Sequence, residues 1–164
     1  MIELLDKSHD RSDFDCGNET LNNYLKYQAG QDVQRKLSVC FVLSDPKTRK
    51  VQGYYTLSNA GIPLHLFPSQ IQKKLPKSYQ SIPATLLGRL AIDLSRQGKG
   101  IGKTLLIDAL RRSFGLSNEI GSFAVFVDPI DSAAEAFYEK YDFVKLPDSG
   151  KMFIPMKTLK DLFS

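Results

Sequence analysis

The pattern of apolar and polar residues divides this chain into short strands and amphipathic helices. Strand-like runs rich in Val, Ile, Leu, Phe and Tyr alternate with polar or glycine-rich breaks. The run 37–43 and the run 51–58 flank Asp45-Pro46-Lys47-Thr48, which predicts an antiparallel hairpin. The other predicted strands are residues 2–5, 86–92, 122–127, 143–144 and 152–156.

Three segments repeat their apolar residues at helical spacing. The first spans 21–36, and Asn18 in front of it is a candidate N-cap. The second, 103–114, carries two adjacent apolar rows, and Gly115 is expected to end it. The third spans 131–141. The order of strands and helices predicts an α/β fold.

Residues 61–83 differ from the rest of the chain in their proline content. Half of the eight prolines fall there, around a short helical piece near 69–75. A long connection of this kind between two strands predicts a surface excursion, which either flanks a functional site or is only an insertion. At the C-terminus, 158–163 is expected to form a turn.

Length and composition indicate one globular domain, residues 1–164. The chain has 164 residues, 42% of them hydrophobic, which is enough to form a core without disulfides. Cys16 and Cys40 are therefore expected to be reduced thiols, and their spacing to His9 and His65 matches no zinc pattern. No apolar run is long enough to cross a membrane and no signal peptide is evident, so a cytoplasmic protein is expected.

The net charge of +4 permits an acidic or nucleic-acid partner without requiring one. The basic residues are clustered, and each cluster is either solvated surface or part of a binding face. The clusters are Arg35-Lys36, Lys47-Arg49-Lys50, Lys73-Lys74-Lys77 and Arg111-Arg112.

The most informative stretch is 84–104, where a buried strand, a glycine turn and a helix follow one another. Gln97-Gly98-Lys99-Gly100-Ile101-Gly102 places glycines at alternate positions just before the helix. Glycines let the backbone approach a ligand, and a helix start offers unpaired N–H groups, so the stretch predicts a phosphate site. A turn that binds nothing is the alternative.

The spacing of the glycines distinguishes the protein families that bind phosphate with a strand, a glycine turn and a helix. The dinucleotide motif needs G-x-G-x-x-G, which Gly98, Gly100 and Gly102 do not supply. Gly102-Lys103-Thr104 matches the end of a Walker loop, and 124–128 imitates a Walker B strand, but Gln97 stands where the first Walker glycine is required. The remaining pattern, Q-x-x-G-x-G, resembles the acyl-coenzyme A loop of the GNAT acetyltransferases.

The resemblance to GNAT enzymes extends over nearly the whole chain. It implies the GNAT fold, an α/β (α+β) arrangement with a mixed, mostly antiparallel sheet of about six or seven strands and about four flanking helices. It also implies acetyl-CoA as cofactor, with the pantetheine arm along the strand before the loop and the pyrophosphate on the loop itself. The residues implied in coenzyme binding are Leu90, Ala91, Ile92, Gln97, Gly98, Lys99, Gly100, Ile101, Gly102, Lys103, Thr104, Asp131, Ala134 and Phe137.

Tyr138 is the predicted catalytic residue. It lies in DSAAEAFYEKYDF, which resembles the second cofactor motif of the family. Acetyl transfer to an amine leaves negative charge on a thiolate, and a phenol with an ordinary pKa near 10 remains protonated at pH 7 and can donate to it. A buried tyrosine bonded to a backbone carbonyl is the structural alternative. No general base is evident in the sequence.

One branch of the family is matched more closely than the others. FDCGNETLNNYL, GYYTLS, LLGRLAID and AFYEKYDF resemble the toxins of toxin–antitoxin pairs that acetylate aminoacyl-tRNA. The resemblance implies aminoacyl-tRNA as acceptor and a ribbon–helix–helix antitoxin as partner, and homodimers are common in the family. Arg89, Arg35 and Lys36 would then contact tRNA phosphates.

Three alternatives remain open from the sequence. The first is a GNAT enzyme that acts on a small amine, a peptide N-terminus or a lysine instead of tRNA. The second is a protein of this fold that binds acyl-CoA without turnover, as a sensor. A P-loop NTPase is the most distant alternative, because of the glutamine at position 97.

Overall fold

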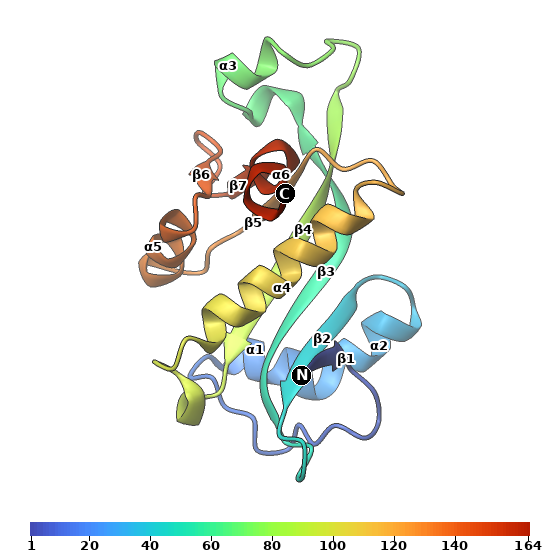
Figure 1. Cartoon of the computed structure of the whole chain (residues 1–164), viewed down its shortest axis with the longest axis vertical. Coiled ribbons are helices and arrows are strands. Elements are labelled where there is room, and N and C mark those ends of the chain that lie inside the picture. The colour runs from blue at the N-terminus through green and yellow to red at the C-terminus, as the bar shows by residue number, and fades with distance from the viewer. The chain divides into compact units, whose positions relative to one another are not determined.

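A computed structural model describes all 164 residues. Its seven strands form one sheet in the order β1-β2-β3-β4-β5-β7-β6 (Figure 1). The pairs β1·β2, β2·β3, β5·β7 and β6·β7 are antiparallel, whereas β4 and β5 are parallel. The strands are β1 (Ile2–Leu4), β2 (Val39–Ser44), β3 (Val51–Pro63), β4 (Ser81–Ile92), β5 (Ala124–Val127), β6 (Val144–Lys145) and β7 (Met152–Pro155).

Helices fill most of the connections between these strands. Two of them, α4 and α5, follow the sequence expectation closely, and Asp131 caps α5 through its side chain. The helical segments are α1 (Glu19–Asn23), the π-helical turn η1 (Tyr24–Gln28), α2 (Ala29–Gln34), the 3₁₀ turn η2 (Leu64–Leu66), α3 (Ser69–Gln72), the 3₁₀ turn η3 (Leu94–Arg96), α4 (Ile101–Leu116), α5 (Ser132–Lys140) and α6 (Met156–Phe163).

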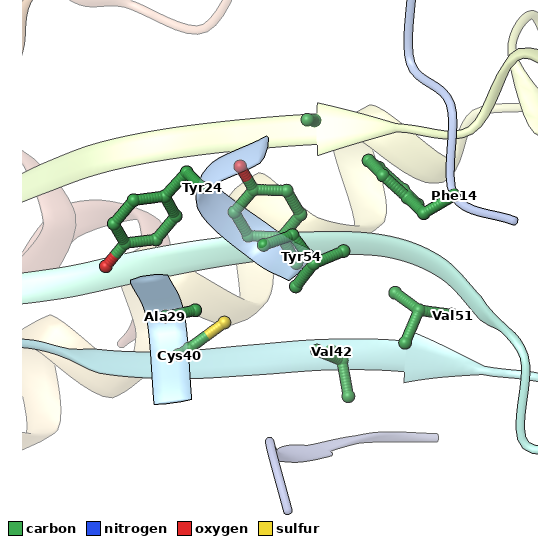
Figure 2. Packing of buried hydrophobic residues seen from close by; sticks show 9 residues of the cluster. Phe14, Tyr24, Ala29, Cys40, Val42, Val51 and Tyr54 are labelled. Carbon is green, nitrogen blue, oxygen red and sulfur yellow. The ribbon is translucent and has the colours of Figure 1, made fainter. Parts of the chain in front are cut away.

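The chain forms two compact units, and β3 and β4 each contribute residues to both. The first unit comprises 1–58 and 87–109. Its core lies between the first helical run and the strands, and Figure 2 shows Phe14 and Tyr24 on either side of Tyr54. The Phe14 and Tyr54 rings meet edge to face at 5.6 Å between centroids, and Tyr24 stacks on Tyr54 at 6.3 Å.

The second unit comprises 59–86 and 110–164. Phe67 lies at the middle of its core, edge to face with Phe123 at 5.5 Å and with Phe153 at 5.3 Å. Every residue of β5 is buried, which agrees with the uninterrupted apolar run predicted for this strand.

The excursion between β3 and β4 is shorter than the sequence suggests. β3 continues to Pro63 and β4 begins at Ser81, so both ends of the predicted 61–83 excursion are strand. Ile82 and Ala84 are buried on either side of Pro83, which is exposed. The carbonyl of Pro83 accepts a hydrogen bond from the Phe123 N–H at 2.8 Å. We call the remaining connection, residues 64–80, the arm.

Two further boundary predictions, both for helices, are wrong. Gly115 does not end α4, which runs to Leu116, because this glycine is not in the left-handed conformation that terminates a helix. The turn predicted at 158–163 is part of a helix that begins at Met156. That helix buries Met156 and Leu159 and brings the Phe163 ring to 6.1 Å from Phe114.

Candidate functional site

The segment that joins β4 to α4 is held by a network of short polar contacts. Asp93 accepts the N–H of Asp15 at 2.9 Å with one carboxylate oxygen, and the N–H and hydroxyl of Ser95 with the other. Burial alone would raise the pKa of Asp93, but these hydrogen bonds outweigh it and lower the pKa. The carboxylate therefore fixes the end of β4 to the N-terminal segment.

Gly98 and Gly100 give the loop a backbone shape that other residues rarely adopt. Their φ angles are +76° and +77°, and no other part of the chain lies within 4 Å of where a Cβ would stand on either residue. The glycines are therefore required by the backbone conformation and not by crowding. They leave open space beside the start of α4, which fits an approaching phosphate group.

The start of α4 adds donors to this open space. The N–H of Thr104 bonds to the carbonyl of Gly100 at 3.1 Å, and the N–H groups of the three residues before it have no intrahelical acceptor. The long helix adds partial positive charge at this end, and Lys99 and Lys103 are exposed beside it. The loop has the donors and the electrostatics of an anion site.

Two polar side chains of the motif are engaged with the loop itself. The amide nitrogen of Gln97 donates to the carbonyl of Ile92 at 2.9 Å and to that of Cys16 at 3.2 Å. The Thr104 hydroxyl donates to the Gly100 carbonyl at 3.1 Å. Both side chains hold the loop in shape.

The residues of β4 before the loop are partly or fully buried. Ala91 is buried, and Leu90 and Ile92 are half-buried. All three lie beyond the two residues of β4 that are in register with β5, Thr85 and Leu86. Their assignment to the coenzyme remains a prediction.

Arg89 is stacked on an aromatic ring. Its guanidinium carbon lies 3.5 Å from the centroid of the Tyr24 ring, which is a close cation–π contact. The Tyr24 hydroxyl donates to the buried carboxylate of Asp32 at 2.8 Å and lies 3.2 Å from the Ser38 hydroxyl. Tyr24 therefore fixes the position of Arg89 on the strand that leads to the glycine loop.

We expect Tyr24→Phe to destabilise the fold by about 1–3 kcal/mol, because Asp32 would lose the hydroxyl that bonds its buried carboxylate. Urea denaturation would measure the loss. Tyr27→Phe is the matched control, since Tyr27 belongs to the same helical turn but is 72% exposed, and it should change stability by less than about 0.5 kcal/mol. Equal effects of the two substitutions would contradict the role of the hydroxyl.

In the second unit, α5 carries the other predicted site residues. The carboxylate of Asp131 accepts the N–H of Ala134 at 2.8 Å, so this side chain acts as the helix cap. Phe137 is half-buried and lies edge to face with Tyr138 at 5.3 Å and with Tyr141 at 5.1 Å.

Tyr138 is the buried aromatic residue of α5. It is 7% exposed, and its ring packs against Phe143 at 5.1 Å between centroids. Burial raises the pKa of Tyr138 well above the ordinary value of 10.0, and no hydrogen bond contributes to the shift. The hydroxyl is therefore protonated at neutral pH, and no hydrogen bond to another group of the chain shifts its pKa.

Arg35 and Lys36 lie together at the end of α2, exposed to solvent. Lys36 has a φ of +61°, the left-handed conformation common just after a helix. Their role in substrate binding stays a prediction. Cys16 is half-buried and Cys40 is buried, and the two are not joined in a disulfide. No helix is long and apolar enough to span a membrane.

Comparison with known proteins agrees with this geometry. Residues 79–159 match the family described as the acetyltransferase (GNAT) domain. A tRNA-acetylating toxin of Mycobacterium tuberculosis is 31% identical over 154 residues, which cover 93% of this chain and 90% of the toxin. The chain belongs to the GNAT family. The fold class and the family predicted from the sequence are thereby confirmed.

Solved structures of GNAT toxins are similar over nearly their full length. A tyrosine-to-phenylalanine mutant of KacT has a TM-score of 0.94 and 35% identity, with 99% of this chain and 98% of KacT covered. AtaT in complex with acetyl-methionyl-tRNAfMet has a TM-score of 0.93 and 34% identity, with 100% and 99% covered. A tyrosine-to-phenylalanine mutant of AtaT has also been solved with acetyl-CoA and the C-terminus of the antitoxin AtaR. Because the chain belongs to the GNAT family, the alternative of a P-loop NTPase is excluded.

Two groups of residues that hold parts of the candidate site were not predicted from the sequence. Asp93 lies just after the predicted strand 86–92, and the apolar pattern does not indicate its bonds to Asp15 and Ser95. The pairing of Tyr24 with Asp32 was also missed, because a regular helix does not bring these positions onto one face. For Asp93, the Asp-x-Ser spacing typical of an Asx turn was an available signal.

Proposed function

We propose that this GNAT enzyme transfers an acetyl group from acetyl-CoA to the α-amino group of an amino acid esterified to tRNA. The observation that carries the proposal is a buried phenol with a raised pKa in a chain that also presents an open glycine loop at a helix start. The full-length similarity to AtaT, which was solved with acetyl-methionyl-tRNAfMet, supports this acceptor over other amines.

The glycine loop fits the diphosphate of the coenzyme. Main-chain N–H groups from Gly98 to Lys103 would bind its oxygens, and Gln97 and Thr104 would keep the loop in its binding shape. Residues 90–92 would line the pantetheine arm, and Ala134 and Phe137 of α5 would contact it as well. When bound, acetyl-CoA supplies the acetyl group as a thioester.

Tyr138 would act as the general acid. Transfer to an amine forms a C–N bond, breaks the C–S bond and leaves negative charge on sulfur. The Tyr138 Oη would donate its proton to that sulfur, the attacking nitrogen would release a proton to solvent, and the phenolate would regain a proton from solvent. Its environment suits this role, because burial favours the neutral phenol over phenolate.

The acceptor amine needs little help from a general base. An α-amino group has a pKa of about 8, and an ester on the same carbon lowers the pKa further, so much of it is uncharged at neutral pH. Arg89, stacked on Tyr24, would contact a phosphate of the RNA, and Arg35 and Lys36 would add sequence-independent attraction.

The proposed reaction implies partners and a place in the cell. Aminoacyl-tRNA is used in the cytoplasm, and acetylation of its amino group would block its use in translation. A toxin of this kind needs an antitoxin, and the structures of the KacTA and AtaT–AtaR complexes with DNA support an antitoxin partner for this chain, for which a ribbon–helix–helix fold is proposed. A homodimer is also proposed, without an assigned interface.

The direct test uses radiolabelled acetyl-CoA with total tRNA, charged in one reaction and deacylated in the other. We expect label in the RNA fraction of the charged pool only. Equal label in both pools would mean that the RNA itself is modified. No label in either pool would overturn the acceptor, and a panel of small amines, peptide N-termini and lysine peptides would then identify it.

The pH dependence tests the protonation state of Tyr138. The raised pKa means that the phenol keeps its proton up to its folded value, so it remains an acid throughout the pH range 6–9. We expect the initial rate to rise as the acceptor amine loses its proton and then to stay level to pH 9. Short reaction times limit ester hydrolysis, and a rate that falls between pH 7 and pH 9 would contradict a neutral Tyr138.

A further inference from the structure

The arm, residues 64–80, has an unusual charge composition. Between Asp45 and Asp93 the chain contains no aspartate or glutamate, and the whole arm lies inside this interval. Lys73, Lys74 and Lys77 are all exposed. With no carboxylate nearby in the sequence, the arm carries a concentrated positive charge, unlike the mixed charges of a typical solvated surface.

The three lysines are not used by the fold. Lysines elsewhere in the chain form ion pairs, such as Lys50 with Asp13 at 3.1 Å and Lys145 with Glu135 at 2.7 Å. No such pair involves a lysine of the arm. Tyr79 lies two residues beyond Lys77 and is 52% exposed, so the arm also offers an aromatic face to solvent.

The arm is nevertheless fixed to the core of the second unit. Phe67 is buried between two aromatic rings, and Ile71 and Leu75 pack against the same core. The Gln72 amide donates to the Phe67 carbonyl at 2.7 Å, and the N–H of Leu64 bonds to the carbonyl of Gln80 at 2.9 Å, which closes the base of the arm. A partner therefore meets lysines on an anchored backbone, which lowers the entropy cost of binding.

We propose that the arm is an RNA-binding surface that uses Lys73, Lys74 and Lys77 for backbone phosphates and Tyr79 for an unpaired base. Ammonium groups combined with an exposed aromatic ring are the chemistry that binds single-stranded and terminal nucleotides. A membrane surface fits less well, because Ile71 and Leu75 face the core and leave no apolar face for lipid. An acidic peptide would use the lysines but has no need of Tyr79.

This inference rests on the proposed function, since it assigns part of the tRNA contact to the arm. It predicts that the arm supplies affinity that is independent of RNA sequence and sensitive to salt. Each phosphate contact contributes about 0.7–0.9 to the slope of log affinity against log salt concentration, depending on whether the RNA is single-stranded or a duplex.

The test compares two double variants with the same change in charge. K73A/K74A removes two lysines of the arm, and K157A/K160A removes two exposed lysines of α6 in the same unit. Filter binding of deacylated tRNA at several salt concentrations measures affinity and slope without acetyl transfer. For K73A/K74A we expect the slope to fall by roughly 1.4–1.8 and the affinity in low salt to fall about tenfold or more, and the control should match wild type.

Tyr79→Ala provides a second, charge-neutral readout. It should weaken binding of a short single-stranded RNA by roughly fivefold or more while leaving the salt slope unchanged, because stacking involves no counterion release. Tyr27→Ala, which removes an exposed tyrosine of the first unit, is its control. Equal binding by wild type and Tyr79→Ala, or equal losses in both charge variants, would overturn the proposal.

The two proposals fail in distinguishable ways. If wild type labels charged tRNA but K73A/K74A binds like K157A/K160A, the arm proposal falls and the proposed function stands. If no RNA is labelled but wild type binds tRNA through the arm, the acceptor assignment fails alone. Binding of poly-glutamate as tightly as RNA would identify an acidic protein as the partner and overturn the RNA assignment.

Discussion

Replacing Tyr138 with phenylalanine is expected to lower the rate of acetyl transfer on the order of 10² to 10⁴-fold. The substitution removes only the hydroxyl and keeps the ring that packs against Phe137 and Phe143. Since that hydroxyl makes no hydrogen bond that shifts its pKa, the fold loses little when it is removed. The loss should therefore fall on kcat, with coenzyme affinity nearly unchanged.

Single-turnover rates with charged tRNA and calorimetric titration with coenzyme A separate the two effects. Tyr141→Phe is the matched control, because Tyr141 follows the same helix and its ring also contacts Phe137. We expect this variant to turn over at the wild-type rate. A Tyr138→Phe enzyme with unchanged turnover would remove Tyr138 from the mechanism, and a loss of coenzyme binding instead of rate would make it a structural residue.

The second large effect is expected from the double variant Gly98→Ala/Gly100→Ala. Each alanine disfavours the left-handed backbone by roughly 1–2 kcal/mol. Because the loop is exposed and has open space beside both glycines, it can relax to another conformation instead of unfolding the protein. The coenzyme would then have to restore the original loop, which lowers its affinity on the order of 10²-fold.

Gly115→Ala is the control for the loop variant. Gly115 lies inside α4 and has open space where the methyl group of an alanine would stand. Alanine there should therefore stabilise the protein by about 0.5–1 kcal/mol and leave coenzyme affinity unchanged. Coenzyme affinity and thermal unfolding would be measured for both variants. A loop variant that binds the coenzyme like wild type would contradict the diphosphate site at the loop.

The fold could be predicted in most respects because its signals are local. Asn18 caps its helix as its position suggests, and β5 was identifiable as a continuous apolar run. The boundaries that were missed depend on tertiary contacts. α6 is a helix because Leu159 is buried and Phe163 reaches Phe114, and neither contact can be derived from the sequence of 156–163 alone.

The candidate site was predictable where its residues are contiguous. The loop 97–104 could be recognised as a unit because one backbone turn determines the spacing of its glycines. The contacts that position Arg89 could not be predicted, since they depend on Tyr24, Asp32 and Ser38 in other elements. The side-chain roles of Gln97 and Asp131 were also beyond the sequence, which indicates only that polar residues stand there.

The π-helical turn η1 has a consequence for any length change in the first helical run. The N–H of Ala29 bonds to the carbonyl of Tyr24 five residues earlier, and the side chain of Arg11 bonds to the carbonyl of Leu25 at 2.9 Å. In a regular helix, residues eight positions apart point about 80° away from each other, and the one extra residue of a π turn brings them back to within about 20°. Deleting a single residue from 25–28 would thus give a regular helix in which Tyr24 and Asp32 still point within about 20° of each other, whereas an insertion or deletion elsewhere between them would separate them. A relative with a regular helix here would align with a one-residue gap, and it could still pair its counterparts of Tyr24 and Asp32 and support its counterpart of Arg89 in the same way.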